Sequence, residues 1–242
     1  MPAVPDFAVY YVPAADDPLY QRGTEILGYD ARTGEFTAND APARAAFANF
    51  NPDWVGPAQE YGFHMTIGHA VRFEAERLGA IEAEIENILN VFDPSKPFVL
   101  TPCDPYIMPL GIDSFGLRFD ANMSLILLHA LIIGRVHPLG TSTLFADEMA
   151  TGQYPDLPPV FAHRTRQYFH PLILDDWYPH LSLLRNYEGD ASDDVITTLT
   201  QVMPRSEQVE VKTICLLIKD EGASHFRVVR EFARADYPHR IG

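Results

Sequence analysis

Apolar residues recur three or four positions apart in two segments of the chain. This spacing predicts amphipathic helices over residues 74–92 and 191–203. The residues on the two apolar faces are Leu78, Ile81, Ile85, Leu89 and Phe92 in the first segment and Val195, Leu199 and Val202 in the second. Each helix therefore needs another element of the protein against which to bury one face.

The same order of elements surrounds both predicted helices. A short strand-like segment precedes each helix, and two strand candidates follow it: 98–103 and 114–119 in the first half, 208–218 and 226–232 in the second. The pattern predicts an α+β fold made of duplicated β-α-β-β units with antiparallel sheets, each with a helix on one face. We expect the two copies to pack as a bilobal domain, with the leading strands beside a central cleft.

The leading strands carry matching motifs. Motif 1 is His64-Met65-Thr66-Ile67 and motif 2 is His180-Leu181-Ser182-Leu183. Residues two apart in a strand point to the same face, so each motif presents an imidazole beside a hydroxyl. Composition alone predicts about 0.2 chance matches to this apolar version of the pattern, so a pair is informative. A third match, His163-Arg164-Thr165-Arg166, has polar residues at its second and fourth positions, which suits the surface of a helix or loop.

These motifs and the duplicated elements resemble the 2H phosphoesterase superfamily, whose members carry two His-x-Thr/Ser-apolar motifs on a bilobal fold. Segments 7–13, 27–30 and 61–64 are similar to uncharacterised bacterial branches of it, including one associated with phosphonate metabolism. Ser182 stands where many members have Thr, and its hydroxyl can play the same donor role. The expected organisation is one bilobal domain over 1–242, with motif regions near 61–68 and 178–184 and a connecting insertion over 138–176.

The motif residues are suited to breaking a phosphodiester. One histidine would take a proton from water and the other would protonate the departing oxygen, while the hydroxyls of Thr66 and Ser182 hold the non-bridging oxygens. The sequence leaves open which of His64 and His180 is the base. Tyr178 shares the parity of motif 2 and is a candidate for substrate binding, although a tyrosine of the core or of an interface fits the pattern as well.

Three residues near the motifs give weaker indications of a role in ligand binding. Gly62 shares the parity of His64, and its missing side chain could leave room for a ligand. Arg72 and Arg185 lie just beyond motif 1 and motif 2 and could offset phosphate charge. Solvated loop arginines are the simpler interpretation of both.

The sequence therefore predicts a metal-independent phosphodiester hydrolase that uses no cofactor. A 2′,3′-cyclic or related cyclic phosphate on a nucleotide, an RNA terminus or a small sugar phosphate is the expected substrate. A nucleotide-binding sensor or regulatory module with little turnover is the alternative. A structural or partner-binding protein, in which both histidines are ordinary core residues, is a third interpretation.

Composition narrows the partners and the compartment. The 242 residues are 47% hydrophobic and carry a net charge of −15, which opposes nonspecific binding to long nucleic acids or anionic membranes. The apolar stretch 125–134 is too short to cross a bilayer and predicts a buried helix that begins near Asn122. Cys103 and Cys215 predict free thiols, and the N-terminal segment lacks the pattern of a signal peptide, so we expect a cytoplasmic protein. Within the insertion, helices are expected over 144–149 and 160–168, with a loop over 153–159.

Overall fold

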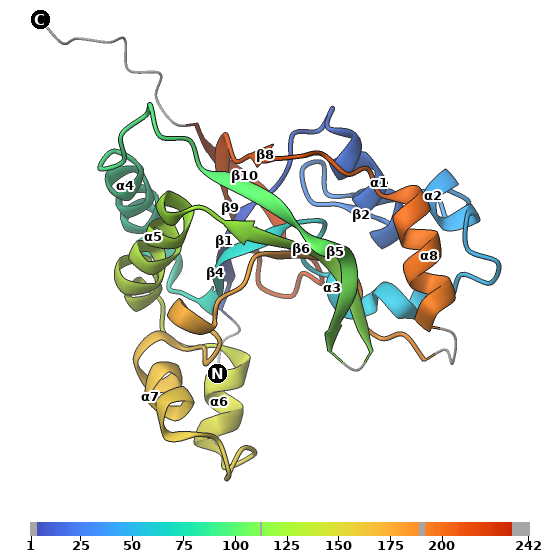
Figure 1. The fold of residues 1–242 in the computed structure, drawn as a ribbon. Helices are drawn as coiled ribbons and strands as arrows, with labels where there is room; N and C mark the ends of the chain where they lie inside the picture. Colours follow the sequence, from blue (N-terminus) through green and yellow to red (C-terminus); the bar gives the residue numbers. More distant parts are fainter. Residues whose placement is uncertain (1–3, 112, 189–191, 234–242) are drawn as a thin grey trace, which may run out of the picture.

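An antiparallel sheet of eight strands, in the order β10-β9-β1-β4-β7-β6-β5-β8, forms the centre of the protein (Figure 1). The structure is a computed structural model that describes residues 4–111, 113–188 and 192–233. The strands in these residues are β1 (Asp6–Tyr11), β2 (Tyr29–Asp30), β3 (Glu35–Phe36), β4 (Met65–Arg72), β5 (Val99–Gly111), β6 (Ser114–Ala121), β7 (His180–Leu184), β8 (Val209–Glu210), β9 (Thr213–Lys219) and β10 (Arg227–Ala233). Only β2 and β3 lie outside the large sheet, as a short hairpin.

Helices lie toward both ends of this sheet (Figure 1). The α-helices in the described residues are α1 (Pro18–Leu27), α2 (Pro42–Ala45), α3 (Gly56–Gln59), α4 (Leu78–Leu89), α5 (Met123–Leu131), α6 (Leu144–Ala150), α7 (Pro159–Tyr168) and α8 (Ser192–Val202). Mixed helices and antiparallel strands confirm the α+β class. The predicted helices over 74–92 and 191–203 correspond to α4 and α8.

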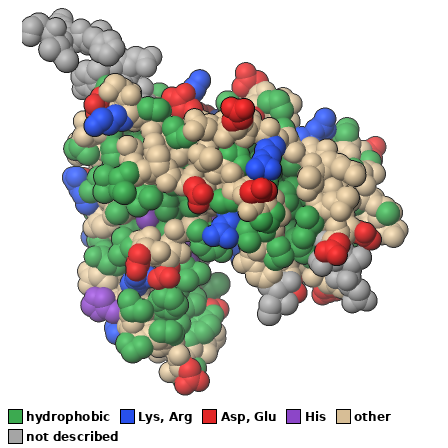
Figure 2. Space-filling model, viewed as in Figure 1, with side chains coloured by type: hydrophobic (Ala, Val, Ile, Leu, Met, Phe, Trp, Pro, Cys, Tyr) green, Lys and Arg blue, Asp and Glu red, His purple; other side chains and the backbone are tan. Residues whose placement is uncertain are grey.

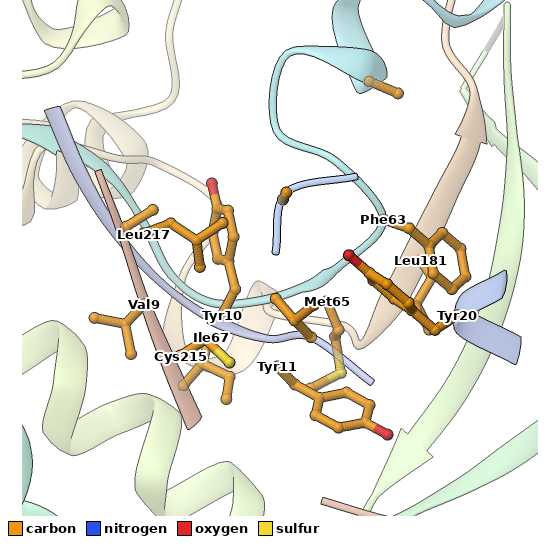
Figure 3. Packing of buried hydrophobic residues seen from close by; sticks show 14 of the residues in the cluster. Val9, Tyr10, Tyr11, Tyr20, Phe63, Met65, Ile67, Leu181, Cys215 and Leu217 are labelled. Carbon is orange, nitrogen blue, oxygen red and sulfur yellow. The ribbon is translucent and has the colours of Figure 1, made fainter. Parts of the chain in front are cut away.

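The two halves of the sheet meet where β4 pairs with β7. Met65 lies opposite Leu181, and both side chains are fully buried. Leu181 and Phe63 lie beside Tyr20 of α1 (Figure 3). The apolar residues of the two motifs therefore anchor the centre of the sheet in the core, as their alternation predicts.

The hairpins that follow the two motif strands exchange sides. The β5–β6 hairpin follows β4 in the sequence, but β6 pairs with β7. The β9–β10 hairpin follows β7, but β9 pairs with β1, which pairs with β4. Each half of the sheet thus combines one motif strand with the hairpin that follows the other motif. Strand pairing satisfies backbone groups that lie far apart in the sequence, and local sequence patterns do not specify these partners.

Buried apolar faces hold the helices in place. In α4, Ile81, Ile85 and Ile88 are fully buried at the predicted spacing, and Arg230 of β10 forms ion pairs with Glu82 and Glu86 on the other face. In α5, the side chain of Asn122 accepts a hydrogen bond from Leu125 N at 3.1 Å, which is a helix N-cap. This start confirms the predicted boundary.

One predicted strand divides into two, and several elements have no counterpart in the sequence analysis. The expected strand over 208–218 is β8 and β9, because Val211 turns inward and its backbone N–H bonds Phe98 O at 2.9 Å. β8 consequently pairs with β5, whereas β9 pairs with β1. Besides the short β2, β3, α2 and α3, the unpredicted elements include β1, a continuous apolar run, and α1, which begins at the N-cap Asp17 followed by Pro18. Both signals are present in the sequence.

The insertion over 138–176 contains α6 and α7, at the positions of the predicted helical pieces. Hydrophobic side chains gather on its surface in the part of Figure 2 where these helices lie. Among them, Leu144 is 65% exposed and Val160 is 51% exposed. In the described part of the chain, no helix is both long enough and apolar enough to span a bilayer. Cys103 and Cys215 are free thiols, as expected.

Candidate active site

The junction of β4 and β7 brings the polar residues of both motifs together. Antiparallel pairing of Met65 with Leu181 sets Thr66 across from His180 and His64 across from Ser182. Because side chains alternate along a strand, these four residues share the side opposite to Met65 and Leu181. We call this side of the junction the motif face. A local two-fold axis through the Met65–Leu181 pair relates its two halves.

His64 is fixed in a single orientation. Its Nδ1–H donates to Gly62 O at 2.8 Å, which leaves Nε2 without the proton, 3.2 Å from Thr66 Oγ1. The ring stacks on Tyr10 of β1, with centroids 3.8 Å apart and planes at 17°. Tyr61 lies on another side, at a centroid distance of 5.9 Å. The proton-accepting nitrogen of His64 is therefore next to the hydroxyl of its own motif.

His180 repeats this arrangement. Its Nδ1–H donates to Tyr178 O at 3.0 Å, so the bond again reaches the carbonyl two residues earlier in the chain. The ring of Tyr178 stacks on that of His180, with centroids 4.9 Å apart. Both histidines thus bind the backbone through Nδ1 and not through Nε2. This shared tautomer is a consequence of the duplicated local geometry.

Gly62 is needed for the backbone rather than for a ligand. Its φ is +69°, and an added Cβ would lie 2.6 Å from Ala31 Cβ. The expectation that its missing side chain leaves room for a substrate is thus replaced by a structural reason. The left-handed conformation at Gly62 directs the carbonyl that holds His64.

Burial and nearby positive charge lower the pKa of both histidines. Burial is the main cause for His64, whose pKa falls to about 4, and His180 and Arg185 lower it further against the opposing effect of the Gly62 carbonyl. Burial also lowers the pKa of His180, and Arg185 contributes in the same direction. Both rings are therefore neutral near pH 7 when no ligand is bound, and the depression of the pKa is larger at His64.

The two arginines beyond the motifs have different environments. Arg72 forms an ion pair with Asp147 of α6, so its charge is already neutralised. Arg185 is exposed, and no carboxylate of the described residues lies within ion-pair distance of it. Its effect on the pKa of both His64 and His180 places its charge near the motif face. Arg185 is thus the better candidate for offsetting phosphate charge.

Two further residues of the motif face come from distant strands. Tyr10 of β1 lies opposite Thr66, and Arg118 of β6 lies opposite His180. The sequence analysis identified neither. The apolar run around Tyr10 signals a buried strand, but no local pattern shows that its ring stacks on His64 or that Arg118 neighbours His180.

The two other fully buried histidines, His129 and His137, each donate from Nδ1 to a backbone carbonyl, and His137 Nε2 has no hydrogen-bond partner in the described residues. His129 donates from Nδ1 to Ile67 O at 2.7 Å and accepts at Nε2 from Leu174 N at 3.0 Å. His69 stacks on His170 with centroids 3.4 Å apart. Across the described residues, no group of three or more His, Cys, Asp or Glu side chains is placed to hold a metal ion.

A polar cavity of about 510 Å³ includes none of the motif residues. Its walls come from α2, α3, the segments next to them and the loop after β7, and include Arg44, Gln59 and Asn186. Asn186 follows Arg185 directly in the chain. The chemistry of the motif residues, rather than the volume of this cavity, defines the candidate site.

Fold and site together define an α+β protein whose central strands display two histidine–hydroxyl pairs on one face. No protein-family model matches the chain, and no curated protein matches it. Among solved structures, it is similar to E. coli LigT complexed with NADP+, at 14% identity and a TM-score of 0.43, over 96% of this chain and 97% of that one. It is also similar to a structure described as a phosphoesterase, at 13% identity and a TM-score of 0.41, over 96% and 98% of the two chains. These similarities are too distant to define a family, so the function has to be inferred from the site.

Proposed function

We propose that the protein is a phosphodiester hydrolase that opens a cyclic phosphate on a nucleotide, RNA terminus or small sugar phosphate without a metal ion. The observation that carries this proposal is the duplicated motif face, where two imidazoles that bind the backbone only through Nδ1 lie beside two hydroxyls. A binding protein has no need of two proton-transfer groups. The resemblance of both motifs to the 2H phosphoesterase superfamily points to the same chemistry.

The environments of the two histidines suggest their roles. We assign His64 as the general base, because its pKa of about 4 keeps the ring neutral and Thr66 already contacts Nε2. His64 Nε2 takes a proton from the water whose oxygen attacks phosphorus. The bond from phosphorus to the leaving oxygen breaks, and His180, which takes up a proton from solvent before the reaction, gives this Nε2 proton to that oxygen. Exchange with solvent then restores both rings.

Charge that builds on the non-bridging oxygens needs donors that are already in place. The hydroxyls of Thr66 and Ser182 flank the histidines and can donate to these oxygens, and the guanidinium of Arg185 supplies positive charge. Tyr178 is assigned to substrate binding, since its ring stacks on His180 and remains 37% exposed. No step of this mechanism requires a cofactor, and a cytoplasmic location remains our expectation.

Turnover of 2′,3′-cyclic nucleotides in the presence of EDTA tests this proposal. Alanine at His64 or His180 should lower turnover by about 10²–10⁴-fold, because each removes a proton-transfer group. If the two histidines act as a unit, the loss of turnover in the double variant should be far smaller than the product of the losses in the two single variants. Alanine at Thr66 or Ser182 should lower turnover by about 10–10³-fold, as expected for the loss of one hydrogen-bond donor to the charged oxygens.

His163→Ala is the matched control, because His163 begins the third His-x-Thr match but is exposed on α7. It should retain wild-type activity. Normal turnover in His180→Ala would refute the mechanism, and activity that is lost in EDTA and restored by a divalent ion would refute the metal-free assignment. Tight nucleotide binding without turnover would favour the sensor instead.

A further inference from the structure

Arginines of this acidic chain are mostly neutralised by carboxylates. Arg32, Arg72, Arg164, Arg227 and Arg230 are among those that form ion pairs. Arg118 and Arg185 have no carboxylate within ion-pair distance in the described residues, and both lie by the motif strands. With 33 acidic residues in the chain, cations without acidic partners at this position indicate a place that attracts anions.

Arg118 is held beside His180 by two features of the fold. The register of β6 and β7 sets Arg118 directly opposite His180. Its guanidinium lies 5.9 Å from the centroid of the Tyr178 ring, a cation–π contact, and its Nη1 is 3.5 Å from Met108 Sδ. Tyr178 in turn stacks on His180. The ring of Tyr178 thus contacts both the guanidinium of Arg118 and the imidazole of His180.

The donor groups of Arg118 remain available for a ligand. The residue is exposed, and a thioether is a weak acceptor that does not neutralise its charge. Asp120 lies two residues further along the same face of β6, opposite Thr101 of β5, and both Asp120 and Arg118 affect the pKa of Cys103. No ion pair joins Asp120 and Arg118 in the described residues, so the guanidinium keeps its positive charge beside the ring of Tyr178.

We propose that Arg118, positioned by Tyr178, binds a second phosphate group of the substrate on the His180 side of the scissile phosphate. This inference rests on the proposed function and narrows its substrate class to phosphodiesters that carry a further phosphate monoester. A planar guanidinium suits bidentate phosphate binding, and Arg185 remains for the scissile group. Leaving groups that carry their own phosphate are therefore preferred.

Equilibrium binding of adenosine 3′-monophosphate and adenosine 3′,5′-bisphosphate separates this inference from turnover. The wild type should bind the bisphosphate about 10- to 100-fold more tightly, as expected for one additional charge-assisted interaction. Arg118→Gln should reduce this preference to about one, and Arg118→Lys should keep part of it, since lysine retains the charge without the bidentate geometry. Tyr178→Leu should weaken the preference by releasing the guanidinium.

Arg166→Gln is the matched control, because Arg166 of α7 is exposed and forms no ion pair within the described residues. It should retain the wild-type preference. Equal affinity of the wild type for both nucleotides, or an unchanged preference in Arg118→Gln, overturns the subsite even if cyclic phosphates are hydrolysed. A preference that depends on Arg118 without any hydrolysis supports the subsite and refutes the hydrolase.

Discussion

Replacing His129 by Gln should remove a defined part of the acid sensitivity of folding. His129 is fully buried between the Ile67 carbonyl and the Leu174 N–H, and its ring stacks on Trp177 with centroids 4.4 Å apart. Protonation of Nε2 would convert it from an acceptor into a donor, and it would then face the N–H of Leu174, which is also a donor. Burial is the main reason that the pKa of His129 falls to about 4.

The sign of the effect follows from proton linkage. The unfolded chain binds this proton at a pKa of about 6.5, whereas the folded protein binds it only near the lower value. The contribution of neutral His129 is therefore complete above the unfolded pKa and is lost progressively as the pH falls toward the folded pKa. Between about pH 7.5 and about pH 5, the expected loss is about 2 kcal/mol of unfolding free energy from this residue.

Urea unfolding followed by tryptophan fluorescence at both pH values measures this loss. His129→Gln should be less stable than the wild type at neutral pH, because packing and hydrogen bonds change, but its stability should fall by about 2 kcal/mol less on acidification. His163→Gln, at an exposed position of α7, should retain the full pH dependence of the wild type. If His129→Gln and the wild type lose equal stability on acidification, His129 is not held neutral by its burial.

Two further predictions concern the motif face. With increasing pH, kcat/KM should rise through about pH 4 as His64 loses its proton. It should then decrease, with a midpoint below pH 6.5, as His180 loses its proton. An optimum above pH 7 would contradict the assigned roles. Gly116→Ala should destabilise the protein by about 1–3 kcal/mol, because an added Cβ would lie 2.4 Å from Leu181 O; urea unfolding should show no such loss for Gly79→Ala, which has open space around it.

The sequence by itself determined the positions of two helices and the faces of the two motif strands. Helical spacing located α4 and α8, and strand alternation put His64 with Thr66 and His180 with Ser182 on the face opposite to the buried Met65 and Leu181. These features are local, because the period of a helix or strand decides which neighbours share a face. They could be read without knowing any partner strand.

Only the tertiary structure decided which strands pair. The hairpins after the two motifs exchange sides, and this exchange places Arg118 of β6 beside His180, while Tyr10 of β1 stacks on His64. The shared use of Nδ1 by the two histidines likewise depends on the backbone carbonyls of Gly62 and Tyr178. Strand pairing and register minimise unpaired backbone groups and exposed apolar area over the whole chain, so the neighbours of each motif are not encoded near it.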